Sequence, residues 1–410
     1  MPVAPASTLK LVVAAAALDA LGPKHRFLTR FVAAAPPDAD GTVHGDLWLV
    51  GGGDPSLASD DLRRGVGALV RAGVKRIDGT LLIDDTAFSG PEQNPRWDPD
   101  DLGYDYAAGT SAISLDDDTV EFDVTPDPAG GAARVRVVPD NEAIAFSGSI
   151  ASGGGDTELT IDRKPDAPSS SESRAEYVLD GHIAQGETQR YFKPVVGVPA
   201  YVGGAVAAML AERGIGLAGG YGTGAAPAGA YVLWSHPSAP LDDLVREMLV
   251  DSNNHTAEQL LRVLGEGDGR PGSDASGIAF EKRELARLAV ARERLQVYDG
   301  SGLAPSDRIM PETLAQLIAR VSQGPYGDTF VRSLPRVGLE GTVKHHDLRD
   351  ALGRTRAKSG HIEGVNGLAG TIVTRRHGRI AFAFIVNDPR ANADIVYQSE
   401  DRALDALSDF

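Results

Sequence analysis

The order in which strand-like and helix-like segments follow one another constrains the fold of this chain more than any other feature. Apolar runs bounded by turn residues predict β-strands at 43–50, 79–85, 119–126 and 132–139. After about residue 200, apolar residues recur at helical spacing, in the segments 203–215, 240–254, 255–265 and 311–323. Two more strand-like runs, 366–374 and 379–387, are joined by a short turn and predict an antiparallel hairpin. The chain is therefore expected to be of the α+β class with a β-rich middle.

The length of 410 residues is more than one hydrophobic core usually covers, so two or three packed units are expected. The Gly-rich and Ser-rich stretches 152–156 and 168–173 are expected to be exposed loops in the β-rich middle rather than tethers between domains.

The charge balance limits the classes of partner. The chain has 40 basic and 57 acidic residues, a formal net charge of −17, which repels phosphate backbones and anionic lipid. Nucleic acid and a membrane surface are therefore not expected as partners. The chain has no cysteine, which excludes disulfides, thiolate metal sites and cysteine nucleophiles.

The most apolar segment near the start, residues 11–18, has two interpretations. It is too short for a membrane-spanning helix, which needs roughly 18 apolar residues, and we expect no membrane span. It is either the stub of a signal peptide or a buried helix that starts near Ser7 and is stopped by Gly22 and Pro23. We favour the helix, because Asp19 directly follows the apolar run.

Ser7 and Lys10 form the first motif that carries chemistry. A serine hydroxyl is a weak nucleophile unless a neighbouring base takes its proton, and a neutral lysine can be that base. Positions i and i+3 of a helix lie on the same face, so Lys10 can reach Ser7. The pair alone is weak evidence, because Ser7 is equally typical of a helix N-cap.

Two further short motifs lie in the C-terminal half. Residues 252–254 are Ser-Asn-Asn between two helical segments, a Ser-x-Asn pattern that can relay a proton and bind an amide. Residues 358–360 are Lys-Ser-Gly before the hairpin, where a cation and a hydroxyl can bind a carboxylate and Gly360 leaves room for a peptide backbone. Taken singly, the first is as typical of a helix connection and the second of a solvated turn.

The three motifs occur in the order Ser-x-x-Lys, Ser-x-Asn, Lys-[Ser/Thr]-Gly, the signature of penicillin-binding proteins and class A β-lactamases. The chain resembles the class C low-molecular-mass penicillin-binding proteins, the D-alanyl-D-alanine carboxypeptidase/endopeptidase family, over nearly its full length. The resemblance extends to four other stretches: GDLWLVGGGDPSL at 45–57, YDYAAGTSAISLDDD at 104–118, YDGSGL at 298–303 and KSGHIEGVNGLAG at 358–370.

The resemblance implies a serine DD-peptidase that acts on peptidoglycan stem peptides and is acylated by β-lactam antibiotics. Ser7 would be acylated, Lys10 would be its base, and Ser252 would relay the proton. The implied fold is a serine β-lactamase/transpeptidase-like domain of helices on an antiparallel sheet, with inserted β-rich domains. Residues 1–30 and 230–410 would form the discontinuous catalytic domain, and 31–229 the insertion, in two subdomains.

The same resemblance implies the binding residues. Asn254 would bind the donor amide, and Lys358 with Ser359 would hold the terminal carboxylate of the peptide. The backbone N–H groups of Ser7 and His361 would form the oxyanion hole. No cofactor or metal is implied, and the location would be periplasmic or otherwise extracytoplasmic, although no export signal is visible in the sequence.

Three departures from the family pattern matter. Ser7 stands close to the start, where the family has several tens of residues, so the N-terminal part of the domain is expected to be missing. Pro305 stands where the family commonly has an Arg that helps to bind the free end of the diaminopimelate side chain. Arg308 is nearby in the sequence, and Asp101 would be the acidic partner in the same subsite. A weaker preference for peptides with a free diaminopimelate end is therefore expected. Ser359 replaces the more frequent Thr and keeps the hydroxyl.

Alternatives remain open at this level. The chain could be a β-lactamase-like serine hydrolase, which needs a second base, or a non-catalytic wall-binding module with a truncated domain. The adjacent pair at 345–346, His-His, is expected to lie in a solvated loop, and the Asp triplet at 116–118 is expected to be a solvated turn rather than a calcium site.

Overall fold

The computed structural model describes residues 1–164 and 175–410. The chain divides into two compact units, each discontinuous in sequence. Unit one contains Met1–Arg26, Asn94–Asp98 and Ala239–Phe410, and unit two contains Phe27–Gln93 and Pro99–Ser238. The Ser-rich stretch 168–173 lies outside the described residues.

Unit one begins with the 3-10 helix η1 (Ala6–Leu9), which leads directly into α1 (Lys10–Leu21). The predicted helix is therefore present, and it ends at Gly22, whose φ of 80° suits a residue without a Cβ. Ser7 lies inside η1, whose N-cap is Pro5, so the alternative interpretation of Ser7 as a helix cap is wrong. The first nine residues of α1, residues 10–18, are all buried.

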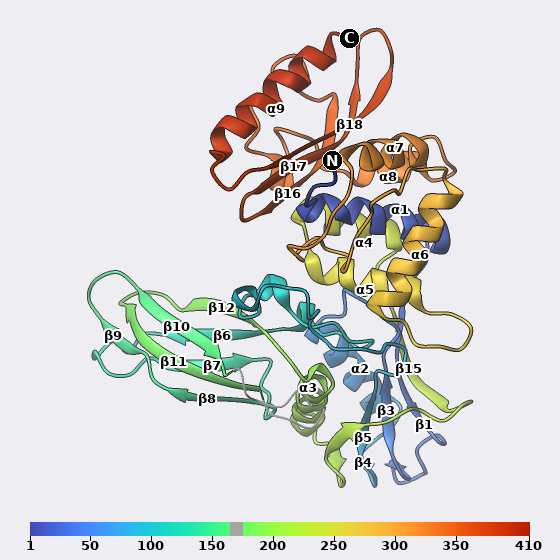
Figure 1. Cartoon of the computed structure of the whole chain (residues 1–410). Coiled ribbons are helices and arrows are strands. Elements are labelled where there is room, and N and C mark those ends of the chain that lie inside the picture. The colour runs from blue at the N-terminus through green and yellow to red at the C-terminus, as the bar shows by residue number, and fades with distance from the viewer. Residues whose placement is uncertain (165–174) are drawn as a thin grey trace. The chain divides into compact units, whose positions relative to one another are not determined.

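The rest of unit one is a layer of helices beside a three-stranded antiparallel sheet, ordered β16 (Thr355–Ile362), β17 (Val365–Val373) and β18 (Arg379–Asn387). The predicted hairpin is confirmed to within one residue. The helices are α4 (Leu241–Asp251), α5 (Asn254–Gly265), α6 (Asp274–Arg287), α7 (Pro311–Val321), α8 (Gly327–Ser333) and α9 (Ala393–Ser408). Figure 1 shows α9 lying beside the sheet, where Leu404 joins Leu368 and Phe382 in a buried cluster.

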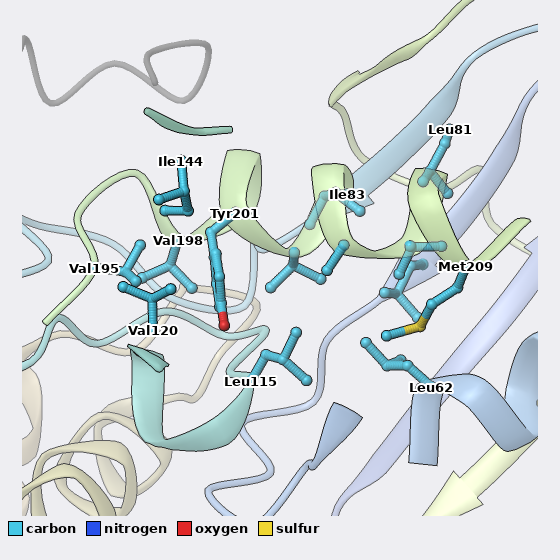
Figure 2. Packing of buried hydrophobic residues seen from close by; sticks show 14 of the residues in the cluster. Leu62, Leu81, Ile83, Leu115, Val120, Ile144, Val195, Val198, Tyr201 and Met209 are labelled. Carbon is cyan, nitrogen blue, oxygen red and sulfur yellow. The ribbon is translucent and has the colours of Figure 1, made fainter. Parts of the chain in front are cut away.

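Unit two contains a five-stranded sheet flanked by two helices. Its strand order is β14 (Tyr221–Thr223), β5 (Leu81–Asp84), β3 (Leu47–Val50), β1 (Leu28–Ala33), β15 (Tyr231–Pro237). β3, β5 and β14 are parallel, because α2 (Ser59–Arg71) lies between β3 and β5 in the chain and α3 (Val198–Glu212) lies between β5 and β14. Figure 2 shows the apolar layer between this sheet and α3, in which Ile83 and Met209 are buried.

The described residues of unit two also form three smaller sheets. Two of them are β13 (Gly216–Leu217), β4 (Arg76–Ile77), β2 (Thr42–Val43), and β12 (Gln189–Pro194), β6 (Thr119–Thr125), β7 (Arg134–Val138). The third is β10 (Glu158–Arg163), β11 (Ala175–Ala184), β8 (Ile144–Gly148), with β9 (Ala151–Gly153) paired to β11. Phe122 and Tyr177 pack edge to face at 5.0 Å between two of these sheets. The α+β fold with a β-rich insertion is confirmed.

Three local expectations need correction. Helix α2 was missed, because Gly65 and Gly67 weaken its helical pattern; a Cβ at Gly65 would lie 3.0 Å from the rings of Phe31 and Trp234. The stretch 152–156 was expected to be an exposed loop, which is wrong for its first two residues, because they belong to β9 (Ala151–Gly153). The triplet at 116–118 forms the 3-10 helix η4 (Asp116–Asp118), in which Asp118 is fully buried, and burial raises its pKa well above the usual range.

The described part of the chain has no helix that is both long and apolar enough to cross a bilayer.

Two valines one turn apart on α2 test the core of unit two. Val66 is 1% exposed and Val70 is 44% exposed. Val66→Ala should lower the free energy of unfolding by about 2 kcal/mol, since it removes buried methyl groups and leaves a cavity. Val70→Ala, the matched control, should change it by less than about 0.5 kcal/mol. Chemical denaturation measures both, and equal effects would contradict the packing described here.

Candidate active site

Ser7 and Lys10 lie one turn apart at the junction of η1 and α1. The Nζ of Lys10 donates to the Oγ of Ser7 at 3.0 Å. Lys10 is fully buried, whereas Ser7 is partly exposed. The predicted i, i+3 contact is therefore present, with an amine on one side of the hydroxyl.

Two distant segments complete the surroundings of the Lys10 amine. Its Nζ also donates to the Oδ1 of Asn254 at 2.6 Å and to the backbone carbonyl of Ser301 at 2.9 Å. A protonated amine has three N–H groups, and a neutral amine has two N–H groups and a lone pair. In either form the Lys10 nitrogen has three hydrogen-bonding positions, and these three neighbours fill them.

The Ser-Asn-Asn motif forms the junction of α4 and α5. Ser252 ends α4 in a left-handed conformation with φ of 64°, which is uncommon for a residue with a side chain. Asn253 caps α5 by accepting a hydrogen bond from the N–H of Thr256 at 2.8 Å. This tight connection places Asn254 in the first turn of α5, where its side chain contacts Lys10.

The Lys-Ser-Gly motif lies in β16. Lys358 is fully buried, and its Nζ donates to the carbonyl of Ser359 at 2.7 Å. The Oγ of Ser359 and the Oγ1 of Thr342 are 2.7 Å apart, so one hydroxyl donates to the other. Thr342 belongs to the 3-10 helix η5 (Gly341–Val343) and was not singled out from the sequence.

Gly360 lets β16 approach η1 closely. A Cβ at this position would lie 2.9 Å from the carbonyl of Pro5 and from the backbone nitrogens of Ser7 and Thr8. The absence of a side chain therefore accommodates the chain's own backbone next to Ser7. On the adjacent position, the Nδ1 of His361 is 3.0 Å from the Oδ1 of Asn366 on β17.

Burial governs the protonation of both lysines. It lowers the pKa of Lys10 to about 7, although the negative charges of Asp299 and Glu258 act in the opposite direction. Burial, and then the positive charge of Lys10, hold the pKa of Lys358 well below its usual range. The two lysines therefore do not both carry a charge readily in the absence of an anion.

Glu258 and Asp299 are site residues that the sequence analysis missed. The carboxylate of Glu258 accepts the N–H of Gly300 at 3.1 Å and that of Ser301 at 2.8 Å. It thereby fixes the peptide whose carbonyl contacts Lys10. The available signal was spacing, because Glu258 follows Asn254 by four residues on one helix.

More buried carboxyl groups surround this pair. Burial, and then the charge of Asp299, raise the pKa of Glu258 to about 8 and that of Asp307 to about 11. Burial also raises the pKa of Glu281 well above its usual range, and the negative charge of Glu258 is the second-largest cause of this rise. Asp307 is therefore protonated at neutral pH.

Asp101 and Arg308 were also predicted as substrate-binding residues. Asp101 belongs to unit two, in the 3-10 helix η2 (Pro99–Asp101), where its Oδ1 accepts from the hydroxyl of Tyr106 at 2.8 Å. The guanidinium of Arg308 donates to the carbonyls of Pro305 at 2.8 Å and Asp307 at 2.6 Å. The roles of Asp101 and Arg308 stay predictions.

The expectation that the pair at 345–346 lies in a solvated loop is wrong for His346. His346 is 5% exposed, and its Nδ1 lies 2.7 Å from the Oδ1 of Asp401. Asp401 is 55 residues further along the chain, on α9, so the local sequence gave no sign of this burial.

The close approach at Gly360 can be tested through stability. Gly360→Ala should lower the free energy of unfolding by about 1–3 kcal/mol, because its Cβ would overlap rigid backbone atoms of η1. Gly267→Ala is the control in the same unit, since a Cβ there meets nothing within 4 Å, and it should change stability by less than about 1 kcal/mol. If denaturation curves show Gly360→Ala to be as stable as the parent, β16 does not lie this close to η1.

Comparison with known proteins places this arrangement in a family. A model of the family described as D-Ala-D-Ala carboxypeptidase 3 (S13) matches residues 1–408. The chain belongs to this family. It is 31% identical over 416 residues to a D-alanyl-D-alanine carboxypeptidase of Actinomadura sp. (strain R39), which covers 96% of this chain and 75% of that protein. It is 25% identical to D-alanyl-D-alanine carboxypeptidase DacB of Haemophilus influenzae, over 93% of this chain and 80% of that protein.

Solved structures confirm the fold. Penicillin binding protein 4 (dacB) from Haemophilus influenzae matches with a TM-score of 0.83 at 23% identity, over 100% of this chain and 92% of that one. A penicillin G acylated endopeptidase, Bd3459 from Bdellovibrio bacteriovorus, matches with a TM-score of 0.55 at 15% identity, over 99% and 86%. The predicted family and the class of enzyme, a serine-type D-Ala-D-Ala carboxypeptidase, are confirmed.

Proposed function

We propose that this S13 family member is a DD-peptidase in which Ser7 is the nucleophile and Lys10 its general base. The observation that carries the proposal is the 3.0 Å contact between a partly exposed hydroxyl and a fully buried amine. Such an amine, with a pKa of about 7, is neutral in a large fraction of molecules at neutral pH and can accept the hydroxyl proton.

The reaction proceeds through an acyl-enzyme. The proton of the Ser7 hydroxyl passes to Lys10 as Oγ bonds to the carbonyl carbon of the penultimate D-alanine. The tetrahedral intermediate collapses, the C–N bond breaks, and the leaving amine of the terminal D-alanine takes a proton that Lys10 releases through Ser252. Water then gives a proton to Lys10 as its oxygen bonds to the ester carbonyl carbon. The bond between that carbon and Oγ breaks, Oγ takes the proton from Lys10, and the shortened peptide leaves with a free carboxyl group. The backbone N–H groups of Ser7 and His361 stabilise the oxyanion.

The other two motifs bind the peptide. Asn254 binds the donor amide, and Lys358 with Ser359 binds the terminal carboxylate. The low pKa of Lys358 in the free protein supports this role, because an arriving carboxylate raises the pKa of a buried amine and restores its charge. A charge-assisted contact inside a buried site is stronger than one in water.

The substrate that fits these groups is a peptidoglycan stem peptide ending in D-alanyl-D-alanine, and β-lactams are inhibitors that acylate Ser7. Relatives in complex with a β-lactam or acylated by penicillin support the second part. Since the substrate lies outside the cytoplasmic membrane, the enzyme acts in the periplasm or another extracytoplasmic space.

Ser7 can be identified by covalent labelling. Incubation with penicillin should give one penicilloyl adduct, which peptide mass spectrometry locates on Ser7. Ser7→Ala should give none, whereas Ser399→Ala, which alters an exposed serine of α9, should be labelled like the parent. An adduct on a different serine would falsify the assignment.

The same labelling separates the alternatives. A parent protein that forms no adduct would support a non-catalytic wall-binding module. An adduct that hydrolyses within seconds would instead support a β-lactamase-like enzyme, because rapid deacylation requires a second base.

The pH dependence tests Lys10. Below its pKa of about 7 the amine is protonated and cannot accept a proton, so the acylation rate should rise about tenfold per pH unit up to that value and then level off. Lys10→Arg keeps the charge but has no basic form at these pH values, and should abolish acylation. Stopped-flow acylation with a chromogenic β-lactam measures both. A rate that is independent of pH between 5 and 8, or an active Lys10→Arg variant, would remove Lys10 from this role.

A further inference from the structure

Four arginines line a hollow of about 310 Å³ in unit one. Arg246 comes from α4, Arg332 from α8, Arg336 from the segment after α8, and Arg356 from β16. A local gathering of guanidinium groups is notable in a chain with a net charge of −17.

One carboxylate serves two of these arginines. The Oε1 of Glu340 lies 2.8 Å from the Nε of Arg336 and 3.4 Å from the Nη2 of Arg246. Asp242, at the edge of the hollow, is paired with Lys24 at 2.6 Å. Asp243 is the third carboxylate of the lining, so four arginines face three carboxylates, one of which Lys24 neutralises. The lining therefore has a positive excess.

Arg332 and Arg356 form no ion pair with any residue that the structure describes. Arg356 donates through Nη1 to the carbonyls of Leu334 at 2.8 Å and Arg332 at 3.3 Å, so neutral backbone atoms hold its guanidinium in place. Arg332 makes one long contact of 3.5 Å with the Oγ1 of Thr329. A guanidinium has five N–H donors, so both side chains have donors left for a further acceptor.

The charges around Arg356 also support the conclusion that the hollow can accept an anion. Burial lowers the pKa of Arg356, and the positive charges of Arg246, Arg336 and Arg332 lower it further, whereas Glu340 acts in the opposite direction. An anion between these arginines would relieve this repulsion.

We propose that the hollow is a binding site for a phosphate group, held by Arg332 and Arg356. A planar guanidinium presents paired donors that match two oxygens of an oxyanion. Two guanidinium groups that both lack a carboxylate partner require more acceptor oxygens than one carboxylate offers, and a phosphate group supplies them. The lining includes none of the proposed catalytic residues, and the ligand is inorganic phosphate or a phosphate unit of a polymer.

Calorimetric titration of the full chain with sodium phosphate at constant ionic strength tests the proposal. We expect saturable binding by the parent and at least about tenfold weaker binding by Arg332→Gln, which loses a charge-assisted contact. Glu340→Gln should bind several-fold more tightly, because it removes the carboxylate that competes for the arginines. A gain in affinity cannot result from misfolding, so the two variants together separate binding from stability.

The matched control is Arg402→Gln, which removes the same charge from an exposed position on α9 and should leave phosphate binding unchanged. Titration with a glycerol-phosphate oligomer distinguishes the source: tighter binding than inorganic phosphate indicates a polymer, and equal or weaker binding indicates free phosphate. The proposal is overturned if the parent does not bind phosphate, if acetate binds as well as phosphate, or if Arg332→Gln behaves like Arg402→Gln.

Discussion

The buried amine of Lys10 is the group on which the geometry of the site depends. It contacts Ser7, Asn254 and the carbonyl of Ser301, and the last of these is 291 residues from Lys10 in the chain. An amine inside a protein loses its hydration and must replace it with hydrogen bonds, so each partner is required by the cost of burial. The same burial lowers the pKa of Lys10 to about 7. One physical cause therefore gathers the three segments and makes the amine a usable base.

The carbonyl that contacts Lys10 is held in place by buried acids. Asp299 accepts the N–H groups of Gly302 and Ala304, both at 2.7 Å, and the indole N–H of Trp97 at 2.9 Å. Glu258 accepts the N–H groups of Gly300 and Ser301, which come directly before Gly302 in the same loop. Carboxyl groups that bind successive backbone donors fix a loop more firmly than packing alone, because each broken hydrogen bond would leave a buried polar group unpaired. The negative charge of these acids also opposes the effect of burial on Lys10, which keeps its pKa from falling further.

The sequence allowed prediction of those parts of the site that depend on local spacing. The contact between Ser7 and Lys10 follows from one helical turn, and the hairpin of β17 and β18, which comes directly after the strand of Lys358, follows from its apolar pattern. The role of the Ser301 carbonyl could not be predicted, since a backbone carbonyl has no sequence signature. Helix α2 was missed because it contains two glycines, one of which, Gly65, serves packing against aromatic rings rather than helix formation. The burial of His346 depends on a partner that only tertiary folding brings near.

The distribution of charge shows why net charge is a poor guide to ligands here. A charge of −17 argues against polyanionic partners, yet the chain buries Lys358 and gathers arginines around one hollow. At physiological ionic strength the field of a surface charge is screened within about 8 Å, so distant acidic residues have little effect on an anion at either place. Buried cations are screened less than exposed ones. Recognition of an anion by this protein is therefore decided by the few guanidinium or ammonium groups within hydrogen-bonding distance, while the acidic surface governs solubility and long-range repulsion.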